Sequence, residues 1–294
     1  MNATGDRTAL AAFVAMSVLA GGNAVAIRFS NRELDPLWGA GLRFALAAAL
    51  LAALMAILRL APPRGRALRG AVLYGVLAIG GAFALAYYGL VHIHAGLGQT
   101  LLAIVPLATL FLAVLQRQER LRLGALAGGV VALAGIALIS NATLEEGVPA
   151  LSLLAVLGGA LCFAQAAVLV RHFPPAHPIT MNAVGMATGA VLLLAGSLVA
   201  RETIQLPDRS ETWLAIGYLV PVGSVVVFVL YLVVLRYWEA SRAAYEFVLI
   251  PVFTVALSTW LDDEPLGLGL LLGGPLVLVG VYIGALRRRR SSPL

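Results

Sequence analysis

Polar and aromatic side chains occur at intervals inside long apolar stretches of this 294-residue chain. Groups of this kind can hold a small molecule through a few hydrogen bonds and ring contacts in an otherwise apolar site. Rings with few charges around them suit a neutral or zwitterionic ligand that carries an apolar or ring group. For any single candidate, packing against other helices or lipid is the alternative. The candidate ligand-binding residues are Asn23, Phe83, Tyr87, Tyr88, Gln99, Phe163, Gln165, Tyr231 and Glu246.

Glu246 is the only acidic residue inside an apolar stretch, where a carboxylate costs a few kcal/mol. Three arrangements offset this cost. Glu246 can pair with Arg242, four residues earlier; it can stay protonated and simply pack; or it can hold a substrate ammonium group or a transported proton. Arg43 lies seven residues past Pro36, and we expect a structural role, with its long side chain snorkelling towards the nearer membrane face.

Several kinds of catalytic chemistry are excluded. The histidines His92, His94, His172 and His177 all fall at the ends of apolar stretches, so no serine–histidine pair can form at depth. No cluster of histidine, cysteine or carboxylate residues has metal-ligand spacing. No GxxxxGK[ST] phosphate-binding loop is present. The sequence therefore predicts no enzyme, no cofactor and no metal site.

The composition identifies the solvent. The chain is 61% hydrophobic and 12% charged, with a mean hydropathy of +0.95, whereas soluble domains have roughly 45–50% apolar and about 25% charged residues. A membrane helix needs about 20 mostly apolar residues. The sequence predicts an all-α polytopic membrane protein with ten transmembrane helices, at residues 8–29, 36–58, 70–91, 95–115, 122–140, 150–171, 178–200, 212–235, 240–261 and 267–286.

The arginines predict the orientation. All 20 basic residues are arginine, and with the N-terminus inside, fifteen lie in cytoplasmic segments and three in outer loops. Positively charged loops remain in the cytoplasm, so we expect both termini to be cytoplasmic. The RRRR run at residues 287–290 then faces anionic lipid rather than nucleic acid. The expected partners are therefore the lipid bilayer and a small-molecule substrate.

Part of the sequence is repeated. Residues 119–129 read ERLRLGALAGG, and 145 positions later residues 264–274 read EPLGLGLLLGG. Pro106 and Pro251 align at the same offset, and proline inside a helix can introduce a kink. We expect these two prolines to act as gating hinges, with a static kink as the alternative.

Because five predicted helices separate the copies, the two halves should have opposite orientations in the membrane. Inverted repeats permit alternating access to a central site. The predicted repeats are residues 1–143 and 144–294.

The segments QRQERLRLGALAGGVVALAGIALI and DDEPLGLGLLLGGPLVLVGVYI resemble the signature of the drug/metabolite transporter superfamily, in its EamA-type branch. The resemblance covers essentially the whole chain and is greatest to bacterial exporters of aromatic amino acids of the YddG type. It implies ten helices as five plus five in the bacterial inner membrane. It also implies export of small amphipathic metabolites, foremost aromatic or large apolar amino acids. Alternatives are a drug or cation exporter of the same fold, or a lipid-handling or scaffolding membrane protein.

Glycines four residues apart, at Gly124 and Gly128 and again at Gly269 and Gly273, allow close helix packing in lipid. Contact between neighbouring helices of one chain is the expected use. A dimer face is the alternative, so the expected state is a monomer or a homodimer.

Overall fold

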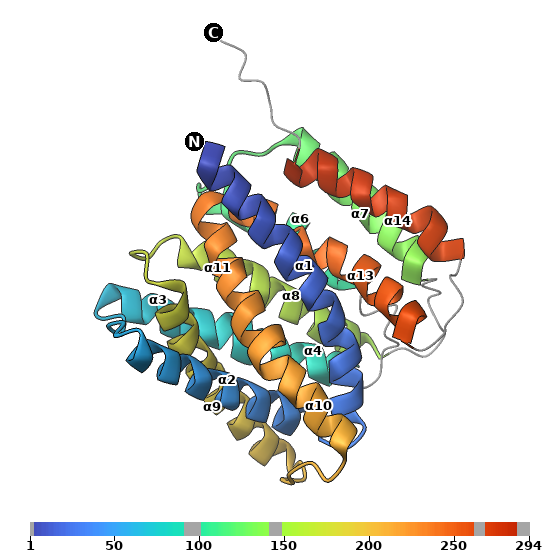
Figure 1. The fold of residues 1–294 in the computed structure, drawn as a ribbon. Helices are drawn as coiled ribbons and strands as arrows, with labels where there is room; N and C mark the ends of the chain where they lie inside the picture. Colours follow the sequence, from blue (N-terminus) through green and yellow to red (C-terminus); the bar gives the residue numbers. More distant parts are fainter. Residues whose placement is uncertain (1–2, 91–100, 141–148, 262–267, 287–294) are drawn as a thin grey trace.

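The computed structural model describes residues 3–90, 101–140, 149–261 and 268–286, and all regular structure in these ranges is helical (Figure 1). The first half contains α1 (Ala3–Asn31), α2 (Pro36–Ile57), α3 (Arg66–Tyr74), the π-helical segment η1 (Gly75–Gly81), α4 (Ala82–Leu90), α6 (Val105–Leu115) and α7 (Leu123–Ser140). The second contains α8 (Ala150–Val170), α9 (Pro178–Ala200), α10 (Ser210–Tyr218), the π-helical segment η2 (Leu219–Val226), α11 (Val227–Tyr237), α12 (Ala240–Ala243), α13 (Glu246–Leu261), α14 (Leu268–Val281) and η3 (Tyr282–Leu286).

Several helices are long and apolar enough to cross a bilayer. Within the described ranges five qualify, two of them formed by consecutive elements that run on through η1 or η2. They are Pro36–Ile57, Arg66–Gly89, Ala150–Val170, Pro178–Ala200 and Ser210–Tyr237. Large apolar side chains such as Ile57 and Val199 are exposed on the outside of the bundle, as expected of a surface that faces lipid. The chain is a membrane protein.

The helix packing follows a paired pattern. In Figure 1, α2 lies beside α9 and α7 beside α14. The other contacts also occur in pairs: α4 packs on α8 as α11 packs on α1, and α6 packs on α8 as α13 packs on α1. The 143- to 145-residue offset of the sequence explains this pattern. It makes the following helices counterparts of each other: α1 and α8, α2 and α9, α4 and α11, α6 and α13, and α7 and α14.

Small residues form the contact between α7 and α14. A Cβ atom built on Gly280 would lie 2.6 Å from the backbone of Gly128 and of Ala132, and one on Gly135 would lie 2.7 Å from the carbonyl oxygen of Gly273. Only glycine permits this approach, because any Cβ atom would overlap the facing backbone. Such close backbone contact stabilises the helix pair, since lipid provides no hydrophobic drive for association. Gly128 and Gly273 therefore pack neighbouring helices of one chain, as expected, while the surroundings of Gly269 are not among those described.

Several predicted spans are not regular helices. The predicted stretch 70–91 contains η1, and 212–235 contains η2, which begins 144 positions after η1. Near the start of α6 a turn at Ala103–Ile104 separates two helical segments, and a turn at Ala244–Tyr245 separates α12 from α13. Such irregular backbone at membrane depth is tolerated where it is buried in protein or lines a cavity.

Candidate functional site

A cavity of about 200 Å³ lies inside the bundle. Its walls are mostly alanine, aliphatic and aromatic side chains, with a few polar groups. Small residues such as Ala20, Ala82, Gly159 and Ala160 leave the space that the larger side chains surround. The lining also includes Asn23, Arg43, Phe83, Phe163, Phe228, Tyr231, Glu246 and Phe247.

The cavity is built from equivalent positions of the two halves. Five pairs of lining residues are each 145 positions apart, which is the offset of the repeated sequence. These pairs are Ala82 and Val227, Phe83 and Phe228, Ala86 and Tyr231, Leu102 and Phe247, and Val105 and Ile250.

Two of the helix interruptions, the turns in the fourth and ninth predicted stretches, adjoin this cavity. Leu102 and Val105 flank the turn at Ala103–Ile104, and Glu246 and Phe247 directly follow the turn at Ala244–Tyr245. In secondary transporters, substrate sites are formed by such discontinuous helices near the middle of the bilayer. The backbone irregularities and the cavity therefore belong to one feature.

Two groups of aromatic side chains contribute to the walls. Phe83 contacts Phe44 edge-on, with ring centroids 4.8 Å apart, and lies 6.5 Å from Phe228. Phe163 contacts Phe247 edge-on at 4.7 Å and lies 5.3 Å from Tyr231. Edge-to-face pairs hold each other in fixed orientations, so the rings form rigid walls that suit a flat or apolar ligand group.

Arg43 lines the cavity. Its side chain is 2% exposed; Nε donates to Ser224 Oγ at 2.7 Å and Nη2 to the carbonyl oxygen of Gly223 at 2.9 Å. The expected snorkelling is therefore wrong, because these bonds to η2 direct the guanidinium inward. Asn23 Nδ2 donates to the same Gly223 oxygen at 3.2 Å. Arg43 Nη1 and Asn23 Oδ1 are buried and have no hydrogen-bond partner among the described residues.

Glu246 also lines the cavity and is the first residue of α13. Its side chain is 4% exposed, and its Oε2 is buried without a hydrogen-bond partner in the described chain. The predicted pair with Arg242 does not form, since Arg242 Nη1 binds Asp6 Oδ1 at 3.3 Å. The turn at Ala244–Tyr245 is the reason, because it interrupts the helix that would place residues four apart on one face.

The remaining predicted residues lie as follows. Tyr87 is buried behind Phe83, with ring centroids 6.2 Å apart, and does not line the cavity. Tyr88 is 50% exposed on the outside of α4, because successive helical residues point about 100° apart. Gln165 accepts a hydrogen bond from Gln116 Nε2 at 2.8 Å, away from the cavity. Gln99 lies outside the described residues.

The two prolines lie in similar but not identical places. Pro106 is in the first turn of α6, two residues after the turn at Ala103–Ile104. Pro251 is inside α13, six residues beyond the turn at Ala244–Tyr245. Neither lines the cavity, although Val105 and Ile250 beside them do.

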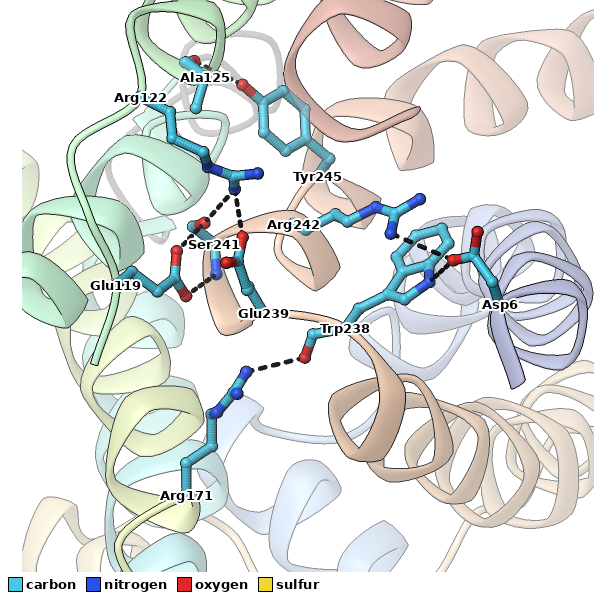
Figure 2. Close-up of polar contacts among 10 residues, drawn as sticks. All are labelled: Asp6, Glu119, Arg122, Ala125, Arg171, Trp238, Glu239, Ser241, Arg242 and Tyr245. Carbon is cyan, nitrogen blue, oxygen red and sulfur yellow. Dashed lines mark hydrogen bonds and ion pairs between the residues drawn. The ribbon is translucent and has the colours of Figure 1, made fainter. Parts of the chain in front are cut away.

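A polar cluster holds α12 against the first half, and we call it the α12 clasp (Figure 2). Glu119 accepts hydrogen bonds from the backbone N–H and the hydroxyl of Ser241. Arg122 Nη2 pairs with Glu239 Oε2 at 2.7 Å. Asp6 Oδ1 accepts from Trp238 Nε1 and Arg242 Nη1. The clasp therefore joins segments more than 110 residues apart, directly beside the turn that precedes Glu246.

Burial raises the pKa of the Glu119 carboxyl above its usual range, although the hydrogen bonds from Ser241 act in the opposite direction. Glu119 is also the first residue of the repeated sequence. The structure explains its role in the first copy as the anchor of α12, while its counterpart Glu264 lies outside the described residues.

A second cluster joins the two halves at the α1–α2 connection, and we call it the loop clasp. The carboxylate of Glu202 accepts from the backbone N–H groups of Leu37 at 3.1 Å and Trp38 at 2.7 Å. These groups belong to the first turn of α2, whose N–H groups have no partner within the helix. Asp35 Oδ2 in turn accepts from the N–H of Thr203 at 2.7 Å. Each clasp thus connects the two halves at a different place.

Sequence reasoning did not select every residue of the site. Phe228 and Phe247 resemble many other aromatic residues in apolar stretches. The 145-residue offset from the candidate Phe83 could have identified Phe228, whereas Leu102, the counterpart of Phe247, is an ordinary aliphatic residue in the sequence. Neither the residue types nor the spacing of Gly223 and Ser224 mark them as part of a binding site in the sequence. Their importance comes from a π-helical segment that brings them to Arg43, 180 positions away or more.

The chain is similar to known transporters. The model of the EamA-like transporter family matches it twice, at residues 7–141 and 150–285. The uncharacterized inner membrane transporter YedA of Escherichia coli strain K12 is 28% identical over 258 residues, which cover 87% of this chain and 83% of YedA. A probable terminal-alkyne amino-acid exporter of Streptantibioticus cattleyicolor is 29% identical over 273 residues, covering 88% and 89%. A solved crystal structure shares the fold, with a TM-score of 0.80 and 18% identity over 99% of this chain and 100% of that one.

Proposed function

Because this chain belongs to the EamA-like transporter family, we propose that it is a secondary transporter that exports small amphipathic metabolites by alternating access. The foremost substrates are aromatic or large apolar amino acids, as for exporters of the YddG type. The proposed location is the bacterial inner membrane, where the similar protein YedA is a transporter.

One observation carries the proposal: an aromatic cavity whose wall contains helix interruptions from both halves of the chain. A cavity in one domain alone would serve binding, whereas a cavity shared by equivalent elements can be opened by moving one half against the other. The proposed halves are residues 1–143 and 144–294, with five helices each, inverted relative to each other and with both termini cytoplasmic.

The two clasps supply the gates in this proposal. The α12 clasp closes the cytoplasmic end and the loop clasp closes the outer end. Alternating access requires that they break in turn, so that the cavity never opens to both sides at once. Pro106 and Pro251 are the proposed hinges. Each directly follows a cavity-lining residue, Val105 or Ile250, and each lies within six residues of a turn that interrupts its helix.

The cavity favours a small substrate. Its volume of about 200 Å³ is below the roughly 300–1,000 Å³ of sites for drug-sized ligands. Five of the predicted residues line it and form the proposed site with Arg43: Asn23, Phe83, Phe163, Tyr231 and Glu246. The similarity to a probable amino-acid exporter also supports an amino acid as the substrate.

Glu246 is proposed to bind a transported proton or a substrate ammonium group. A buried carboxylate in a membrane helix is costly and is by default a functional residue. The same residue supports a second candidate function, the export of small organic cations.

A flux experiment with purified protein in liposomes tests the proposal. Phenylalanine, tryptophan and leucine should cross faster than aspartate, a sugar phosphate or tetraethylammonium. An imposed pH gradient should accelerate the flux if Glu246 carries a proton. Faster transport of tetraethylammonium would select the cation exporter, and equal rates for all solutes would contradict both functions.

A further inference from the structure

Two unpartnered polar atoms belong to cavity-lining residues that share one hydrogen-bond acceptor. Asn23 Nδ2 and Arg43 Nη2 both donate to the carbonyl oxygen of Gly223, at 3.2 and 2.9 Å. The remaining atoms of the same two planar groups, Asn23 Oδ1 and Arg43 Nη1, are buried and have no partner among the described residues. Both residues line the cavity. A donor with positive charge and an acceptor are thus held side by side.

The Arg43 guanidinium is held by hydrogen bonds but has no counter-ion among the described residues. Ser224 and Gly223 hold Nε and Nη2, and the rings of Phe44 and Phe83 lie 5.0 and 5.8 Å from Cζ. No ion pair within the described ranges includes Arg43. A buried cation without an anion is unfavourable. A ligand carboxylate at Nη1 would supply a negative charge and accept hydrogen bonds from the Nη1 N–H groups.

Asn23 supplies the complementary group. Its orientation follows from the bond to Gly223, because only the amide nitrogen can donate to a carbonyl oxygen. Oδ1 is therefore an acceptor, which suits an ammonium group. The absence of a side chain at Gly223 lets Asn23 approach, since a Cβ there would overlap Oδ1.

We propose that Arg43 and Asn23 form a head-group site for an α-amino acid, in which Arg43 Nη1 binds the carboxylate and Asn23 Oδ1 accepts from the ammonium group. The substrate side chain then lies against Phe83 and Phe228, whose ring centroids are 6.5 Å apart. This assignment rests on the transport function proposed above and specifies which part of the substrate each residue binds. Glu246, whose Oε2 has no hydrogen-bond partner in the described chain, remains available for a proton.

Three ligands that differ only in the head group test the assignment. Phenylalanine has both charged groups, 3-phenylpropionate lacks the ammonium group, and phenethylamine lacks the carboxylate. Binding to purified wild-type protein should be strongest for phenylalanine. Arg43→Gln should weaken phenylalanine and 3-phenylpropionate by roughly tenfold to a hundredfold, the range expected for a hydrogen bond to a charged group, and leave phenethylamine unchanged. Asn23→Ala should weaken phenylalanine and phenethylamine but not 3-phenylpropionate.

Two controls separate binding from folding. Arg236→Gln makes the same chemical change on the exposed surface of α11. Asn182→Ala removes a fully buried amide that has no hydrogen-bond partner in the described chain and does not line the cavity. Neither variant should alter the order of the three ligands.

Several results would overturn the assignment. Equal losses for all three ligands in Arg43→Gln would give Arg43 a purely structural role. If Arg43→Gln does not fold, wild-type protein that binds both analogues as tightly as phenylalanine contradicts the head-group site by itself. Wild-type protein that transports phenylalanine but fails these tests refutes only the head-group site. Wild-type protein that transports no amino acid refutes the proposed function as well.

Discussion

Removal of the Glu119 carboxylate should open the cavity from the α12 end. In the structure, this carboxylate accepts hydrogen bonds from the backbone N–H and the hydroxyl of Ser241 and so holds α12 in place. A hydrogen bond to a charged group contributes about 1.5–3 kcal/mol, and the burial of Glu119 offsets part of this. We therefore expect Glu119→Ala to weaken the closed clasp by about 2 kcal/mol, which corresponds to a roughly thirtyfold larger open population.

A single reactive cysteine in the cavity can measure this population. Ala20→Cys places a thiol on the cavity wall, and Cys162→Ala removes the one native cysteine. The rate of modification by a membrane-impermeant maleimide, added from the α12 side, then reports clasp opening. In this background Glu119→Ala should raise the rate roughly thirtyfold, in line with the 2 kcal/mol estimated above.

Glu239→Ala is the matched control within the same clasp. Its ion pair with Arg122 is partly solvent-exposed on both sides, and such pairs contribute about 0–1 kcal/mol. The labelling rate should therefore rise less than about fivefold. Equal acceleration by Glu119→Ala and Glu239→Ala, or no acceleration by either, would refute the reasoning that the buried carboxylate closes this end.

Three further predictions concern the pH response of the α12 clasp, the transport rate of a Glu246 variant and the packing of α7 against α14. Burial raises the pKa of Glu119, so the closed clasp binds a proton more tightly than an open one. The labelling rate of the reporter cysteine, divided by that of a free thiol at the same pH because maleimide reacts with the thiolate, should rise with pH between the ordinary and the raised pKa, and Glu119→Gln should remove this excess. Glu246→Gln should leave the protein folded but lower transport at least roughly tenfold, about 1.4 kcal/mol of transition-state stabilisation, and wild-type flux would remove this residue from the site. Gly280→Ala, whose Cβ would lie 2.6 Å from backbone atoms of α7, should destabilise the protein by about 1–3 kcal/mol in thermal unfolding. Gly217→Ala, with no atom within 4 Å of its Cβ, should be neutral or stabilising, and equal melting temperatures for the two would contradict the close α7–α14 contact.

Much of the helical framework was predictable from composition and pattern. The predicted stretches 36–58, 150–171 and 178–200 match α2, α8 and α9 to within one residue at each end, because an apolar run of this length has few other stable states in lipid. The glycine spacing at Gly128 likewise predicted a close contact. Glycine allows such an approach regardless of which helix the partner belongs to, and the structure identifies α14 as the partner.

The candidate site was predictable only in part. Five of the residues selected from the sequence line the cavity, and their binding of a ligand stays a prediction: Asn23, Phe83, Phe163, Tyr231 and Glu246. Tyr88 and Gln165 have the same composition signal but point elsewhere. A polar or aromatic residue in an apolar stretch marks a candidate binding residue. Which side of its helix faces the cavity depends on the neighbouring helices, and residue type does not indicate it.

The sequence by itself determined that this is a helical membrane protein of the EamA-like family, with a 145-residue offset between similar segments. Hydropathy and repeated residues are properties of the chain, so they need no tertiary contact. The tertiary structure decided the partners of the charged groups: Arg43 binds η2, about 180 positions away, and Arg242 binds Asp6 rather than Glu246. Helical periodicity relates neighbouring residues only while the helix is continuous. The turn at Ala244–Tyr245 and the π-helical segment η2 interrupt it, and beyond such points only packing sets which groups meet.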